Sequence, residues 1–64
     1  METETKEFYS PEEIAERLQV NKMTIYRLLT RGELPYHQIG KLKRISRVDF
    51  DEFLQKTRVD VTRS

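Results

Sequence analysis

Basic side chains are concentrated in the middle of this sequence. Residues 21–47 carry seven Lys or Arg residues and a single acid, Glu33, for a net charge of +6. The flanks are acidic, with six acids and two bases in residues 1–20 and four acids and three bases in residues 48–64. Lys and Arg bind phosphates through charge and guanine edges through hydrogen bonds. In a chain of net charge +1, this centre predicts a local anionic partner, with a solvated charged surface as the alternative.

Length and composition exclude several classes of function. A chain of 64 residues is expected to form one small domain without a deep catalytic pocket. It has no cysteine, which removes disulfides and thiolate metal sites and permits a reducing environment. Its start lacks the pattern of a signal peptide, and no apolar segment approaches the roughly 20 residues that span a bilayer. We therefore expect a soluble, cytoplasmic protein with no membrane contact and no cofactor.

The residue types that most often catalyse reactions are poorly placed for it here. His37, the only histidine, falls in a predicted strand without a cysteine or second histidine to complete a metal site, so we interpret it as a half-exposed strand residue. Asp49 and Glu52 are one helical turn apart, but beside Ser46 they are explained as favourable charges in a first turn. The sequence favours a binding module over an enzyme.

Capping residues mark the starts of three helices. Ser10 and Glu13 have the spacing of a capping box and predict a helix over residues 11–18. Asn21 begins a second helix that stops at Gly32. Ser46 begins a third, which ends near residue 56. Three pairs with the spacing of a hydrophobic staple support these starts, namely Tyr9 with Ile14, Val20 with Ile25, and Ile45 with Phe50.

A hairpin is predicted between the second and third helices. Residues 36–45, YHQIGKLKRI, place Gly40 and Lys41 between short apolar runs, which predicts two strands of about four residues each. The alternation along them is imperfect, so it leaves the register open. We assign residues 8–56 to one domain and expect residues 1–7 and 57–64 to be flexible. The predicted fold is mainly α with a small β-hairpin, in the order helix, helix, hairpin, helix.

The first two helices have the spacing of a helix-turn-helix pair. Small Ala15 suits a close approach of the two helices. The apolar positions expected to face one another across the turn are Ile14, Leu18, Val20, Ile25 and Leu28. With the hairpin added, the pattern predicts a winged helix-turn-helix, in which the second helix recognises DNA.

The outer face of the second helix carries the candidate contact residues. If Ile25, Leu28 and Leu29 point inward, the helical period turns the other side chains outward. The candidates for DNA contact are Asn21, Lys22, Met23, Thr24, Tyr26, Arg27 and Thr30. Two have structural alternatives, because the Tyr26 ring can cover the edge of the core and Met23 can fill a gap in it. Arg31 is better explained by the helix C-terminus than by DNA.

Three further cations lie on the predicted hairpin, which would form a wing beside the second helix. They are Lys41, Lys43 and Arg44. A wing can place Lys and Arg against neighbouring phosphates or in a narrow minor groove. The alternative is a charged edge strand that resists aggregation.

Residues 9–54 resemble the small winged-helix DNA-binding domain of the excisionase family, which is related to the DNA-binding head of MerR-type regulators. The resemblance is carried by TIYRLL followed by GELP, then IGKLKRI and VDFDEFL. It implies that the second helix enters the major groove and that the wing meets adjacent backbone or minor groove. Two positions depart from the pattern: Gln19 stands in the turn where the broader class often has glycine, and Leu42 stands near the wing tip where the family is usually polar.

The resemblance implies three possible roles. The first is an excisionase that bends double-stranded DNA and helps an integrase, a tyrosine or serine recombinase, to remove a prophage or mobile element from a prokaryotic nucleoid. This role is preferred because MerR-type regulators add a coiled coil and an effector domain, which this sequence lacks. The second is a small transcriptional regulator that binds operators. The third is an adaptor whose basic face holds an acidic protein. Small size also predicts cooperative self-association on DNA.

Overall fold

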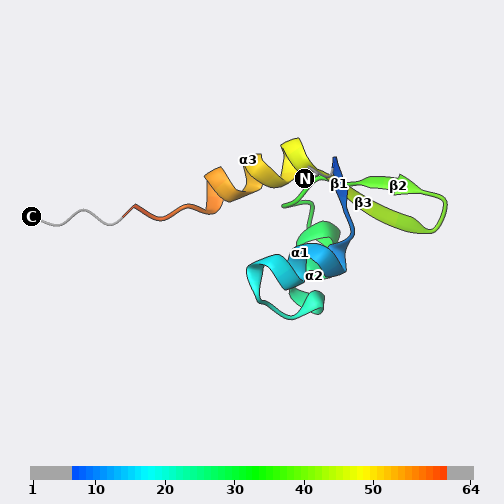
Figure 1. The fold of residues 1–64 in the computed structure, drawn as a ribbon, viewed down its shortest axis with the longest axis horizontal. Helices are drawn as coiled ribbons and strands as arrows, with labels where there is room; N and C mark the ends of the chain where they lie inside the picture. Colours follow the sequence, from blue (N-terminus) through cyan, green and yellow to red (C-terminus); the bar gives the residue numbers. More distant parts are fainter. Residues whose placement is uncertain (1–6, 61–64) are drawn as a thin grey trace, which may run out of the picture.

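Three helices and a three-stranded sheet make up the part of the chain that the computed structural model describes, residues 7–60. Figure 1 shows α1 and α2 below the sheet, and α3 and the β2–β3 hairpin extending to opposite ends of the molecule. The predicted order of helix, helix, hairpin and helix is confirmed, as is the winged helix-turn-helix class. In chain order the elements are β1 (Phe8–Tyr9), α1 (Pro11–Leu18), α2 (Lys22–Thr30), β2 (His37–Ile39), β3 (Leu42–Ser46) and α3 (Arg47–Thr57).

Each helix begins at its predicted cap. The hydroxyl of Ser10 accepts the Glu13 N–H at 3.1 Å, and the Glu13 carboxylate accepts the Ser10 N–H at 2.9 Å, which completes the capping box. The Asn21 side-chain oxygen accepts the Met23 N–H at 2.8 Å. The Ser46 hydroxyl accepts the Asp49 N–H at 3.0 Å. These bonds satisfy backbone donors that have no partner within the helix, so the cap residues fix where each helix starts.

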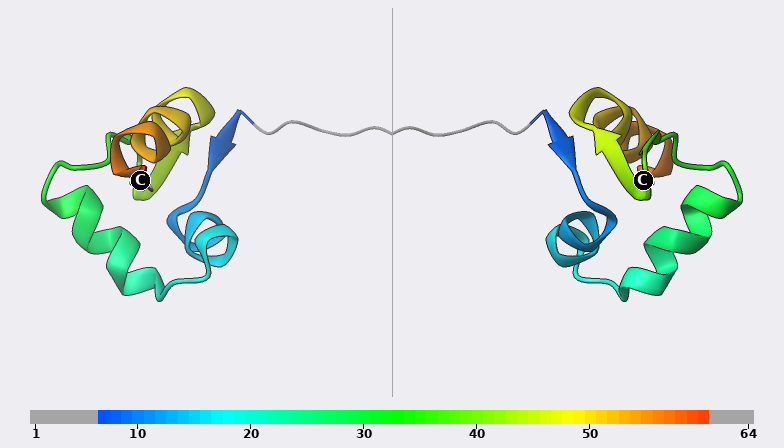
Figure 2. Two further views of the ribbon diagram at one scale, coloured as in Figure 1. Left: turned by 90° about the vertical axis from the view of Figure 1, so that its left-hand side faces the viewer. Right: turned by 90° about the vertical axis from the view of Figure 1, so that its right-hand side faces the viewer.

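The turn between α1 and α2 depends on Gln19. This residue adopts the left-handed conformation, with φ of 57° and ψ of 46°. The Val20 N–H then donates to the Ala15 carbonyl at 2.9 Å and closes the end of α1. The turn is therefore as tight as one with glycine, although a side chain occupies a conformation that favours glycine. Figure 2 shows α1 nearly end-on while α2 runs across the view, so the two helices cross steeply.

The sheet contains a strand that the sequence did not predict. Its order is β1-β3-β2, and both pairings are antiparallel. In β1, Phe8 pairs with Ser46 and Tyr9 with Ile45. The Glu7 carbonyl accepts the Arg47 N–H at 2.8 Å and continues this pairing to the start of α3. Of the expected flexible arm and tail, residues 1–6 and 61–64 lie outside the described residues, whereas Glu7 takes part in the pairing just described and Thr57 is the last residue of α3.

The hairpin has a defined register. His37 pairs with Arg44, Gln38 with Lys43, and Ile39 with Leu42, which leaves Gly40 and Lys41 as a two-residue turn. Gly40 has a φ of 60° at the first central position, as a type II′ hairpin turn requires. The strands are three and five residues long, close to the predicted length.

One hydrophobic core joins the three helices to the inner face of the sheet. It consists of Tyr9, Ile14, Ala15, Ile25, Leu29, Leu34, Ile45, Phe50 and Phe53. Of the five positions predicted to face one another across the turn, Ile14 and Ile25 are buried, Leu18 and Leu28 are only partly buried, and Val20 is 41% exposed, so its prediction is wrong. Val20 follows the left-handed residue of the turn, which leaves the side chain outside the helix pair. Leu34, which is fully buried, was not predicted because it lies in a loop without periodicity.

Candidate nucleic-acid interface

The outer face of α2 is exposed as the helical period predicted. Lys22, Thr24, Arg27 and Thr30 are exposed, and Met23 is 54% exposed, so its assignment to the core is excluded. Ile25 and Leu29 point into the core from the opposite face of the helix. Asn21 is also exposed at the start of the helix, but its side-chain oxygen is used as the cap. This face therefore offers two cations, two threonine hydroxyls and one thioether to a partner.

Tyr26 makes a contact that neither sequence interpretation included. It is half-buried, and its hydroxyl donates a hydrogen bond of 2.6 Å to the Glu12 carboxylate on α1. This bond is the main reason that the pKa of the Glu12 carboxyl is lowered, with smaller contributions from its own backbone N–H and from the charges of Lys22 and Arg44. The same bond raises the pKa of Tyr26, because ionisation of the phenol would remove the donated proton.

A hollow of about 390 Å³ separates α2 from the wing, which consists of β2, β3 and their turn (residues 37–46). Tyr26 and Glu12 lie at its helical side, and residues of the wing lie at the other. The residues that line it are Ser10, Pro11, Glu12, Tyr26, Lys41, Leu42, Lys43 and Arg44. Of the candidate residues on α2 and on the wing, this hollow brings together Tyr26 and all three wing cations.

The wing cations do not all face the same way. Side chains alternate along β3, so Arg44 and Leu42 share one face of the sheet, while Lys43 shares the other with buried Ile45. The Lys43 ammonium lies over the Tyr36 ring, 5.6 Å from its centroid. The Arg44 guanidinium instead lies close enough to Glu12 and Tyr26 to influence the pKa of both. Arg44 and the turn residue Lys41 are therefore the wing cations best placed beside α2.

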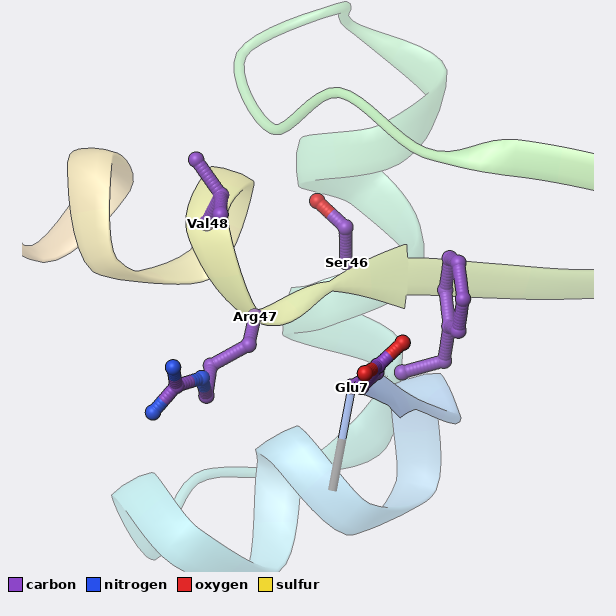
Figure 3. Close-up of a pocket in the computed structure, with 5 residues that line it drawn as sticks. Glu7, Ser46, Arg47 and Val48 are labelled. Atoms are coloured by element: carbon purple, nitrogen blue, oxygen red, sulfur yellow. The ribbon is translucent and has the colours of Figure 1, made fainter. Parts of the chain in front are cut away.

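Two other bases of the central segment lie apart from this surface. Arg31 caps the end of α2 and forms an ion pair of 2.9 Å with Glu33, in agreement with the structural role expected for it. Arg47 lies at a separate hollow of about 260 Å³ between β1 and the start of α3. Figure 3 shows this second hollow, with Arg47 and Val48 pointing to different sides of the first turn of α3. The charge of +6 in residues 21–47 is thus distributed over several faces.

Residues that suggested other chemistry have structural roles. His37 lies in β2 as predicted, but it is exposed rather than half-exposed. Its ring and that of Phe8 form a T-shaped pair, with 5.5 Å between the ring centroids. Asp49 occupies the first turn of α3. Within residues 7–60, no three His, Cys, Asp or Glu side chains are grouped so that they could hold a metal ion. No helix in this same range is long and apolar enough to cross a membrane.

Comparison with known proteins agrees with this geometry. Residues 8–58 match the helix-turn-helix domain family, which contains excisionase-type proteins. A protein of Bacillus subtilis (strain 168), YvgK, described as uncharacterized, is 33% identical over 51 residues. That match covers 80% of this chain and 17% of YvgK, so the chain spans a small part of this relative's length. No solved structure matches significantly. The chain belongs to the helix-turn-helix domain family and is a DNA-binding helix-turn-helix protein.

Proposed function

We propose that this protein binds double-stranded DNA sequence-specifically through α2 and the wing, and acts as an excisionase. The observation that carries the proposal is the hollow that Tyr26 of α2 shares with Lys41 and Arg44 of the wing, on a helix whose outer face is exposed. In this arrangement α2 enters the major groove, and Arg27 or Lys22 reads guanine edges. The wing contacts the backbone or the adjacent minor groove.

The proposed role in excision is architectural. Several copies bound side by side bend the DNA so that an integrase, a tyrosine or serine recombinase, bridges distant sites. Two features support this proposal: the family contains excisionase-type proteins, and α2 exposes cations and hydroxyls on the same molecule as the cations of the wing. The DNA, the integrase and further copies of this chain are the proposed partners, in the cytoplasm of a prokaryote or of a cell carrying its phage.

Footprinting on genomic fragments tests the proposal. The expected result is protection of repeated sites inside an attachment region of a mobile element, together with increased excision when the protein is added to the integrase. Protection of a promoter would indicate the alternative, a regulator that binds operators through the same helix and wing. Replacement of both Lys22 and Arg27 by alanine should abolish protection while the unfolding transition is retained. If this double variant binds DNA normally, the basic face serves an acidic protein instead.

A further inference from the structure

Glu12 is an acid at the centre of a basic surface. Among the described residues that line the hollow between α2 and the wing, it is the only acidic one, and three of the others are cations. Its carboxylate is exposed, and it is held in place by the Tyr26 hydroxyl at 2.6 Å. Lys22 and Arg44 approach it from α2 and from β3. This carboxylate therefore occupies the position to which the surrounding positive groups would attract an anion.

The groups around Glu12 also suit a phosphate. Tyrosine, Lys and Arg donate hydrogen bonds to phosphate oxygens as they do to carboxylate oxygens. The Tyr26 hydroxyl carries a single proton, so it can donate either to Glu12 or to a phosphate but not to both. A phosphate in the hollow would also lie beside the negative charge of Glu12. The Glu12 carboxylate and a phosphate therefore compete for the same hydrogen-bond donor and the same positive charges in the hollow.

DNA that contacts both α2 and the wing must place a backbone phosphate in the hollow between them. The sugar-phosphate backbone is the ridge that separates the major groove from the minor groove. If α2 lies in the major groove and the wing at the adjacent minor groove, the backbone crosses the hollow between them. This step rests on the proposed function, because it requires both elements to contact one duplex.

We propose that Glu12 is an internal competitor for a DNA backbone phosphate in the hollow between α2 and the wing. The competitor keeps Tyr26 in place in the free protein and weakens the attraction of this surface for DNA of any sequence. Displacing Glu12 costs free energy, and only a duplex whose bases also make the specific contacts with α2 compensates for this cost. Glu12 is thus a specificity-determining residue although it reads no base.

The variant Glu12→Gln tests the proposal, because glutamine still accepts the Tyr26 hydrogen bond but carries no charge. Its affinity for a short duplex of random sequence should rise about fivefold, the effect of removing one unit charge about 4 Å from another in water. The salt dependence should steepen by about 0.9 in slope, since one more phosphate is engaged. Glu16→Gln is the matched control, because it removes the same charge one turn along α1 and outside the hollow.

A second pair of variants separates competition from general electrostatics. Tyr26→Phe should reduce affinity for random-sequence DNA more in the E12Q background than in the wild type, since a neutral amide holds the Tyr26 hydroxyl less strongly than a carboxylate and gives it up more readily to a phosphate. Equal gains for Glu12→Gln and Glu16→Gln would overturn the role of Glu12 and leave the proposed function intact. If Glu12→Gln removed the preference for one base pair of a specific site, Glu12 would contact a base. That result would also overturn the role proposed for Glu12. If the wild type and E12Q both fail to bind any duplex at low salt, the proposed function itself is wrong.

Discussion

Because Tyr26 donates a hydrogen bond to Glu12, the ionisation of the Glu12 carboxyl reports directly on the surface between α2 and the wing. The folded protein favours the charged form of Glu12, since the Tyr26 bond lowers its pKa below the usual value of about 4.3. Glu12 therefore stabilises the fold above that usual value, and this contribution is lost as the pH falls through the lowered pKa. A titration of the Glu12 carboxyl carbon by NMR should show a low midpoint that Tyr26→Phe raises. Tyr36→Phe, whose ring faces Lys43, should leave the midpoint unchanged.

Arg27 is the residue expected to read sequence. It is exposed near the middle of the outer face of α2, where an arginine can bind the O6 and N7 atoms of guanine. Arg27→Ala should weaken specific binding by about 1–3 kcal/mol and flatten the preference at one base pair. Arg31→Ala is the control, because Arg31 is paired with Glu33 at the end of the helix and should change binding little. Titrations on the site and on its single-base variants measure both effects, and a uniform loss on all sequences would make Arg27 a phosphate contact.

At the scale of elements, the turn between α1 and α2 is the clearest place to alter stability. Gln19 has a φ of 57°, and the left-handed conformation costs a residue with a side chain roughly 1–2 kcal/mol. Gln19→Gly removes that cost but adds about 0.5–1 kcal/mol of backbone entropy. The variant should therefore be more stable by up to about 1 kcal/mol in denaturant unfolding. Gln55→Gly, within α3, should be less stable by a similar amount, so a loss at both positions would contradict the role assigned to Gln19.

The two faces of the wing should differ in their contribution to DNA binding. All three wing cations line the hollow, but Arg44 lies close enough to Tyr26 to influence its pKa and Lys41 lies in the turn, whereas the Lys43 ammonium lies over the Tyr36 ring. Alanine at Arg44 or Lys41 should lower affinity on all sequences and reduce the salt slope by about one unit for each lost phosphate contact. Alanine at Lys43 should have a smaller effect, and Lys56→Ala on α3 serves as the distant control. An unchanged slope in both the Arg44 and Lys41 variants would refute the wing assignment.

What could be predicted for each element depended on how local its determinants are. The helix starts were predicted correctly, because Ser10, Asn21 and Ser46 act on N–H groups within three residues. The exposed face of α2 followed from its period alone. The pairing of Phe8 with Ser46 could not be predicted, since a strand of two residues has no periodicity and its partner lies far along the chain. The Tyr26–Glu12 bond, across 14 residues, depends in the same way on the packing of α1 against α2.

For the whole molecule, size limits what one copy can do. A single module with one recognition helix and one wing buries only about 600–1,000 Å² on DNA, at the lower end for specific complexes. The acids of α1 do not form a single patch that could attract another copy, because Glu12 faces the hollow and Glu13 belongs to the capping box. Asp51 and Glu52 are instead exposed on α3, and α3 and the wing extend in opposite directions (Figure 1). Copies aligned along DNA would bring these acids toward the basic wing of the next copy.

This arrangement predicts head-to-tail cooperativity. Free protein should sediment as a monomer, but on direct repeats about one helical turn apart each bound copy should increase the affinity of the next. Gel-shift titrations on one, two and three repeats measure the increase, and a phased-bend assay detects the expected bending. The double variant Asp51→Asn with Glu52→Gln should bind one repeat normally yet lose cooperativity on three, because it removes charge far from α2. Independent binding by the wild type, or a stable dimer without DNA, would refute this assembly and favour an operator-binding regulator.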